Sequence, residues 1–139
     1  MKIICVGIIG PQNNPLLIHT DFSGEERKNI EYIVYTALDF CEEKIPAMSG
    51  NKKSSLFESY LGLLFPTEDL RVYGYVTNTH HKYVLVLDDS DVKDVDTKKF
   101  FVQLHDIFIQ AISNPFYNYG EKIESLNFIS NLKSLISKS

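Results

Sequence analysis

Cysteine is scarce in this chain, with Cys5 and Cys41 the two examples among 139 residues. A small secreted scaffold held together by disulfides needs a larger set of cysteines, so this class is excluded. Cys5 lies in an apolar run typical of a strand, and Cys41 lies in a run with helical periodicity. We therefore expect both thiols to be small, buried apolar side chains.

Positive charge is neither abundant nor clustered. The chain has 14 Lys and Arg against 18 Asp and Glu, which gives a net charge of −4 and a pI of about 5.5. A nucleic-acid-binding domain shows a basic face, and a protein held at a lipid surface by charge shows a polybasic segment. The sequence has neither, so it predicts no nucleic-acid partner.

Long apolar runs are also missing. No stretch approaches the ~20 apolar residues that a membrane-spanning helix needs. The apolar run at 3–9 is short and ends in a turn rich in Gly, Pro and Asn, without a cleavage pattern. These features predict a cytoplasmic protein with no direct membrane insertion. The length and ordinary composition predict one globular domain over residues 1–139.

The common catalytic and metal-binding motifs are absent. There is no phosphate-binding loop, nucleophile elbow or zinc-binding helix pattern. The acidic run that starts at Asp89 invites a calcium-loop interpretation, but Asp94 and Phe100 stand where an EF-hand loop needs Gly and Glu. A solvated turn before a helix N-terminus explains this run instead. We therefore expect no enzyme activity, no metal and no cofactor.

Four histidines are scattered along the chain. His80 and His81 are adjacent in an expected turn, where their side chains point apart and rarely chelate one metal. We expect a surface or edge role for both, and also for His19 and His105. A nucleophilic pair of Cys41 with His105 stays open at this point, although a thiol on a buried helical stripe is usually inert.

Alternating or continuous apolar patterns predict five strands, at 2–9, 16–20, 60–65, 70–77 and 82–88. Within the fourth strand, Arg71, Tyr73 and Tyr75 fall on one face and Leu70, Val72 and Val76 on the other. The first and last strands are apolar on both faces, so we expect them to lie at the centre of a sheet. Residues 78–81 are expected to form a compact hairpin turn.

Helical spacing predicts three helices. The first begins with a capping box at Ser23–Glu26 and runs from Gly24 to about Lys44, because Pro46 argues against its continuing. The second is capped by Asp96 or Thr97 and ends before Pro115. Its expected buried stripe consists of Phe101, Leu104, Phe108 and Ile112. The third follows Gly120, with an expected apolar face of Ile123, Leu126, Ile129, Leu132 and Ile136.

The resulting order is β-β-α-β-β-β-α-α. Short connections favour antiparallel pairing, and the doubly apolar strands require helices on both faces of the sheet. This pattern predicts an α+β fold of the profilin or longin type, in which a five-stranded antiparallel sheet lies between helical layers.

The first helix carries an unusual solvent side. Apolar residues recur along it at helical spacing, at Ile30, Ile33, Val34, Ala37, Leu38 and Cys41. At 100° per residue this buried stripe centres near Ala37 and Cys41, and the opposite side carries a group of aromatic and acidic residues. This group consists of Tyr32, Tyr35, Asp39, Glu42 and Glu43. Tyrosine is enriched at protein interfaces because it combines contact area with a polar tip. The group is therefore either a partner-binding surface that selects a basic partner, or a set of rings covered by neighbouring loops.

Longer motifs resemble a known family. The segment Tyr60–Asp69, followed by Val72–Asn78, closely resembles the subunit 2-like branch of the sedlin family in the membrane-tethering complex TRAPP. Similar matches occur at Leu38-Asp39, Glu43–Ile45, Ala47-Met48, Asn114–Asn118 and Gly120. The resemblance covers nearly the whole chain. It departs from the family at 49–57, and Glu42 stands where sedlin has aspartate.

The resemblance implies a longin-like fold with one helix on one sheet face and two on the other. It also implies a non-catalytic adaptor role in endoplasmic reticulum–Golgi transport. The partners would be other small TRAPP subunits of the Bet3 type and the larger subunits, with a Rab GTPase reached only indirectly through the assembled complex, which promotes its nucleotide exchange. The protein would be peripheral at those membranes through the complex. By analogy with sedlin, the acidic stretch Asp39, Glu42 and Glu43 is functionally sensitive.

Two alternatives remain open from the sequence. A stand-alone longin-type regulatory module would bind a SNARE or a small GTPase directly, but the sequence shows no SNARE heptad helix after the domain. A small-molecule binder or enzyme on the same fold would need a pocket, for example between the first helix and the sheet, which the sequence does not reveal.

Overall fold

The computed structural model describes residues 3–10, 12–20, 22–49, 60–66, 70–77, 80–88, 94–117, 123 and 126–137. The side chains of residues 42–49, 60–62, 65, 66, 94 and 126 lie outside the described set. The elements are β1 (Ile3–Ile9), β2 (Pro15–Thr20), α1 (Gly24–Ser49), β3 (Tyr60–Pro66), β4 (Leu70–Val76), β5 (Lys82–Asp88), α2 (Asp94–Ile112) and α3 (Leu126–Ser137). Their order confirms the predicted one.

The sheet has the strand order β2-β1-β5-β4-β3, and every neighbouring pair is antiparallel. The doubly apolar strands β1 and β5 lie inside the sheet, as predicted. In β5 every residue from Lys82 to Leu87 is buried, because helices cover both of its faces. The predicted hairpin between β4 and β5 is closed by hydrogen bonds from Thr77 N to His81 O (2.9 Å) and from His80 N to Thr77 O (3.0 Å).

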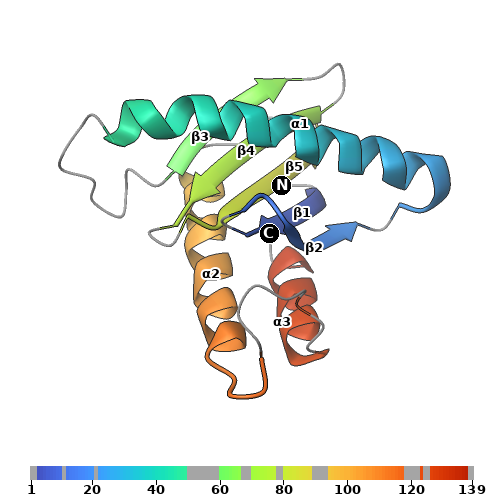
Figure 1. Ribbon diagram of the computed structural model, residues 1–139. Helices are drawn as coiled ribbons and strands as arrows, with labels where there is room; N and C mark the ends of the chain where they lie inside the picture. The colour runs from blue at the N-terminus through green and yellow to red at the C-terminus, as the bar shows by residue number, and fades with distance from the viewer. Residues whose placement is uncertain are drawn as a thin grey trace.

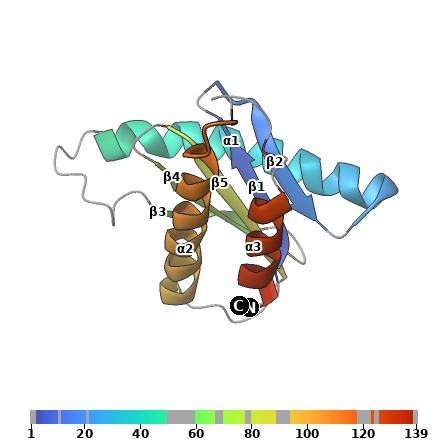
Figure 2. The ribbon, with the colours of Figure 1, turned by 90° about the horizontal axis from the view of Figure 1, so that it is seen from below.

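The helices form two layers, with α1 across one face of the sheet and α2 and α3 side by side on the other (Figures 1 and 2). Alternation along β4 decides which side chain enters which layer. Val72 and Val76 pack in the cluster beneath α1, whereas Tyr73 and Tyr75 pack in the cluster beneath α2 and α3. The α+β, longin-like architecture expected from the sequence is therefore confirmed.

Helix α1 approaches the sheet closely over a glycine. A Cβ atom added at Gly7 of β1 would lie 3.3 Å from Cγ1 of Val34, so a larger side chain there would push α1 away. Ile30, Val34, Ala37, Leu38 and Cys41 form the buried side of the helix, as predicted.

The predicted end of α1 near Lys44 is wrong, because the helix continues through Pro46 to Ser49. Proline lacks an N–H, so position 46 cannot donate the helical hydrogen bond to the carbonyl of Glu42. Proline disfavours a helix interior because of this lost hydrogen bond and a steric clash of its ring. This cost is local, so a long helix whose buried side packs on a sheet can continue through a proline.

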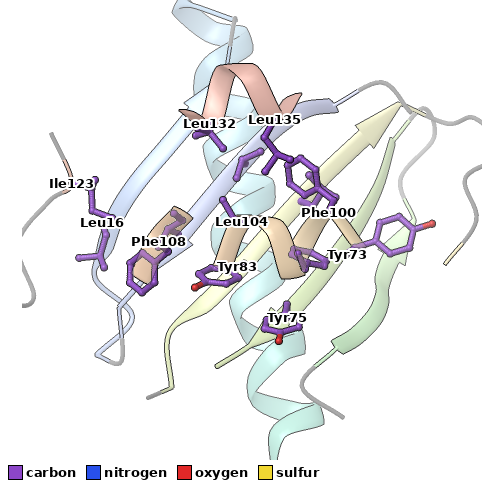
Figure 3. Packing of buried hydrophobic residues seen from close by; sticks show 14 of the residues in the cluster. Leu16, Tyr73, Tyr75, Tyr83, Phe100, Leu104, Phe108, Ile123, Leu132 and Leu135 are labelled. Carbon is purple, nitrogen blue, oxygen red and sulfur yellow. The ribbon is translucent and has the colours of Figure 1, made fainter. Parts of the chain in front are cut away.

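The second face is packed by α2 and α3 (Figure 3). The predicted α2 residues Phe101, Leu104 and Phe108 are fully buried, and Ile112 is partly buried. The predicted cap at Asp96 or Thr97 is wrong, because α2 begins at Asp94 and Thr97 is buried within the helix.

The predicted face of α3 is also partly wrong. The helix begins at Leu126, and its buried positions are Phe128, Leu132 and Leu135, with Ile136 partly buried. Ile129 is half-buried, and Ile123 is buried but precedes the helix. This short helix has apolar residues on more than one side, so the sequence is compatible with two different buried faces. The face that packs against the sheet is the one that contains Phe128.

The outer edge of β2 is partly covered. The carbonyl of Leu16 accepts a hydrogen bond from Ile123 N (2.9 Å), and the carbonyl of Ile18 accepts one from a guanidinium nitrogen of Arg27 (3.2 Å). The chain ahead of α3 and the start of α1 are thereby tied to this edge.

Candidate partner-binding surface

The solvent side of α1 carries exposed tyrosines. Helix periodicity turns Tyr32, Tyr35 and Asp39 away from the buried side, and all three are exposed. The exposed fraction is 73% for Tyr32 and 44% for Tyr35, so the alternative in which loops cover both rings does not hold for Tyr32. Large exposed aromatic surface is unusual on one helix side unless another molecule covers it.

Two predicted members of this surface are seen only through their backbone. Glu42 and Glu43 lie within α1, one turn beyond Asp39, but their side chains fall outside the described residues. We use the name α1 face for Tyr32, Tyr35 and Asp39 together with these two glutamates. The role of the α1 face as a partner site stays a prediction.

A shallow groove adjoins the α1 face, and the sequence did not reveal it. It has a volume of about 270 Å³, its floor is β2 from Pro15 to Ile18, and Arg27, Glu31, Tyr35 and Ile123 complete its lining. The hollow is open to solvent, and it is continuous with the α1 face because Tyr35 belongs to both.

An ion pair sits in the wall of this groove. Arg27 Nε lies 3.1 Å from Glu31 Oε1, one helical turn away, and the same guanidinium donates to the carbonyl of Ile18. In the sequence, the i, i+4 spacing of Arg27 and Glu31 indicates that this ion pair can form. The hollow itself forms where β2 packs against α1, and no short sequence pattern predicts that contact.

The cysteines lie on the same side of the sheet and away from the histidines. Cys5 and Cys41 are buried in the cluster beneath α1, as predicted. Burial raises the pKa of the Cys5 thiol to about 12, so this thiol stays protonated and inert at neutral pH. His105 lies on α2, on the opposite face of the sheet, so the nucleophilic pair of Cys41 with His105 is excluded.

One histidine is not where the sequence placed it. The surface role predicted for His81 is wrong, because its side chain is 1% exposed and its ring centroid lies 5.0 Å from that of Phe108. His105 is half-buried, and its Nδ1 lies 2.8 Å from the Tyr83 hydroxyl oxygen. His80 is exposed, as predicted. The polar residues of the turn predicted that His81 is exposed to solvent. In the structure α2 covers His81, which ends this turn.

Burial lowers the pKa of both His81 and His105, which disfavours the imidazolium form. The two rings also repel each other when charged, which lowers the pKa of His81 further, while Asp106 acts in the opposite direction on His105. Neutral imidazoles packed among Tyr and Phe rings belong to the core between the sheet and α2. They do not form a site open to a substrate.

Within the described ranges, no three His, Cys, Asp or Glu side chains gather to hold a metal ion. The rejected calcium-loop segment lies outside those ranges, since residues 89–93 and the Asp94 side chain are not described. None of the helices in the described part of the chain combines the length and apolar character that crossing a bilayer requires.

Comparison with known proteins identifies the family. The family model described as Sedlin matches residues 8–138. The chain belongs to the sedlin family.

Three relatives named trafficking protein particle complex subunit 2-like protein support this assignment. The Dictyostelium discoideum protein is 46% identical, covering 97% of this chain and 96% of its own. The Bos taurus protein is 43% identical, covering 90% of each chain. The Rattus norvegicus protein is 41% identical, covering 96% of each chain.

These likenesses confirm the resemblance to the sedlin family, including its subunit 2-like branch. Each of the three relatives carries the name of a subunit of a trafficking protein particle complex. In this chain the α1 face offers exposed tyrosines, and the adjoining groove is open to solvent.

Proposed function

We propose that this chain is a non-catalytic adaptor subunit of a TRAPP-type vesicle-tethering complex that acts in endoplasmic reticulum–Golgi transport. It supports the assembled complex, which promotes nucleotide exchange on a Rab GTPase, and it reaches the cytoplasmic side of those membranes through the complex. Its membership of the sedlin family supports this role. The proposal also includes that residues 1–139 form a single domain.

The α1 face is the surface that we propose for the partner. The observation that carries this proposal is the 73% exposure of the Tyr32 ring on a helix whose opposite side is fully buried. Burying a tyrosine at the centre of an interface contributes strongly to affinity, and such residues dominate the binding energy of many complexes. Asp39, Glu42 and Glu43 add negative charge beside the rings, which favours a partner with basic residues and speeds its encounter.

The partner that we propose for this face is a small TRAPP subunit of the Bet3 type, with a larger subunit attached through the same region or a sheet edge. The groove beside β2 extends the α1 face, because Tyr35 belongs to both. A partner residue that packs against Tyr35 can therefore also reach the hollow between α1 and β2.

Replacing Tyr32 with alanine is expected to weaken binding of the Bet3-type subunit by roughly 10- to 100-fold, as for a central aromatic contact. The melting temperature should stay nearly unchanged, because substitutions of exposed residues usually alter stability by about 0.5 kcal/mol or less. Affinity can be measured by titrating purified partner onto immobilised chain, and stability by thermal unfolding.

The matched control is Asn131→Ala, an exposed residue of α3, which lies on the opposite face of the sheet from the α1 face. It should leave affinity unchanged. Charge reversal by Glu43→Lys should slow association and make it less sensitive to salt. Equal loss with Asn131→Ala and Tyr32→Ala would contradict the proposed face. Repeated failure of tagged wild-type chain to recover any TRAPP subunit from cell extract would contradict the adaptor role itself.

A further inference from the structure

The turn that follows α2 presents a phenylalanine ring to solvent. Phe116 is 91% exposed, the highest fraction among the exposed large apolar side chains in the described part of the chain. Exposure of one apolar residue is common on protein surfaces. The turn that holds this ring distinguishes it from the other exposed apolar residues.

Two hydrogen bonds fix the conformation of this turn. The backbone N–H of Tyr117 donates to the carbonyl oxygen of Asn114 (3.0 Å), and the N–H of Phe116 donates to Oδ1 of the same asparagine (3.0 Å). Asparagine and proline are favoured at the first and second positions of a β-turn, and Pro115 restricts its own φ. The four residues Asn114 to Tyr117 therefore specify one conformation together.

The core holds both ends of the turn in place. Ile112 ahead of it and Tyr117 at its end are partly buried against the cluster beneath α2 and α3. Between them, Asn114, Pro115 and Phe116 are exposed. Because the turn is already ordered, binding costs it little conformational entropy, which is the usual advantage of a preorganised recognition element.

The polar groups around the ring define what a partner must offer. Pro115 has no N–H, and those of Phe116 and Tyr117 are already bonded within the turn. Among the described residues, none hydrogen-bonds to the amide nitrogen Nδ2 of Asn114 or to the carbonyl oxygens of Pro115 and Phe116. A partner would therefore meet a phenyl ring flanked by an amide donor and two carbonyl acceptors.

The surrounding sequence carries no charge. No charged residue occurs from Ile107 to Gly120, where Asp106 precedes the run, and Glu121 and Lys122, of opposite sign and outside the described residues, follow it. A charged partner surface would lose hydration here without gaining an opposite charge. The segment also lacks the basic residues that bind an anionic bilayer. An uncharged protein surface is the complement that remains.

The shape of the feature selects a concave partner. A flat surface can cover only one face of a projecting phenyl ring, whereas an apolar pocket removes the whole ring from water. Aromatic anchors that enter such pockets supply most of the binding energy at many interfaces. The hydrogen-bonding groups beside the ring would meet the rim of the pocket.

We propose that Asn114-Pro115-Phe116 is a docking motif for a protein domain with an uncharged, phenyl-sized apolar pocket whose rim accepts a hydrogen bond from the Asn114 amide. The motif follows α2, on the opposite face of the sheet from α1, and the orange segment after α2 points away from α1 (Figure 1). The proposal therefore goes beyond the α1 face, and it allows the chain to hold a second partner at the same time.

Photocrosslinking beside the motif tests the kind of partner. The full chain, carrying benzoylphenylalanine at the exposed position 113, replaces the endogenous subunit in cells, so that Phe116 itself stays unaltered. The crosslinked peptides are identified by mass spectrometry. Position 103, exposed in the middle of α2, is the matched control. We expect position 113 to crosslink to the rim of an apolar pocket on another protein, and Phe116→Ala in the same chain to abolish that product.

The identified partner is then titrated onto purified full-length variants. Phe116→Ala should weaken binding by at least about tenfold, as for a central anchor. Phe116→Tyr should weaken it roughly 5- to 100-fold, because the pocket would bury an unpartnered hydroxyl. Asn114→Asp keeps an oxygen for the N–H of Phe116 but removes the amide donors, so binding should weaken about fivefold or more. Gln103→Ala should change affinity less than about twofold. All four variants should keep the wild-type melting temperature.

Crosslinking at position 113 to a second copy, to lipid, or to a flat or charged surface would overturn the proposal. So would a product that persists with Phe116→Ala, or one no stronger than at position 103. Wild-type affinity of Phe116→Tyr would show that the ring enters no pocket and would also overturn it. Because position 32 reports on the α1 face separately, a crosslink there to a TRAPP subunit in any of these cases would leave the adaptor role standing.

Discussion

Replacing Phe108 with alanine is expected to lower the free energy of unfolding by about 3–5 kcal/mol. The Phe108 ring has no exposed surface, and its centroid lies 5.0 Å from that of His81 and 5.7 Å from that of Tyr83. Its removal leaves a cavity between α2 and the sheet and exposes a buried imidazole. Because a domain is stable by only about 5–15 kcal/mol in total, much of the chain's stability depends on this ring. Urea denaturation measures the change.

Phe116→Ala provides the matched control for this substitution. Both residues are phenylalanines, but Phe116 follows the end of α2 and is 91% exposed. Its replacement should change the free energy of unfolding by no more than about 0.5 kcal/mol. Similar losses for the two variants would show that α2 does not pack on the sheet as described.

The second large effect is a loss of stability in mild acid. Burial lowers the pKa of His81 and His105 below the ordinary value of 6.5 in the folded protein. Between the folded and unfolded pKa values the unfolded chain binds more protons, so the free energy of unfolding rises with pH across that window. This stability is fully present above about pH 6.5 and is lost as the pH falls through the folded pKa values. Each pKa unit of difference corresponds to about 1.4 kcal/mol.

Thermal unfolding between pH 7.5 and pH 5 measures this dependence above the range in which most carboxyl groups titrate. His105→Gln should flatten the profile, since its amide oxygen can accept the Tyr83 hydroxyl hydrogen without titrating. His80→Asn is the control, because His80 is exposed and adjacent to His81 in sequence. Its φ of 64° is one that asparagine tolerates. An unchanged slope in His105→Gln, or an equal change in His80→Asn, would contradict the assignment.

Patterns with strong periodicity were predictable from the sequence. The doubly apolar runs of β1 and β5 identified the central strands, and the 3.6-residue spacing of Ile30, Val34 and Cys41 identified the buried side of α1. The same spacing placed Tyr32 and Tyr35 on the solvent side. Each of these predictions depended on a pattern that repeats over several residues, so a single residue that departs from the pattern did not change the prediction.

Features decided by distant contacts were not predictable. His81 is buried because α2 crosses over the end of the turn before β5, and nothing near residue 81 in the sequence indicates that cover. The groove beside β2 depends on how α1, β2 and Ile123 meet. The register of α3 likewise depends on packing against the sheet, which outweighs local preferences.

The hydrogen bonds on the outer edge of β2 have a further consequence for a copy of the chain that stands alone. An uncovered edge strand can recruit strands from other molecules and seed fibrous aggregates. Here Arg27 and the backbone of Ile123 occupy the carbonyls of Ile18 and Leu16, so an incoming strand would have to displace both. An isolated copy is thereby protected from polymerising through this edge.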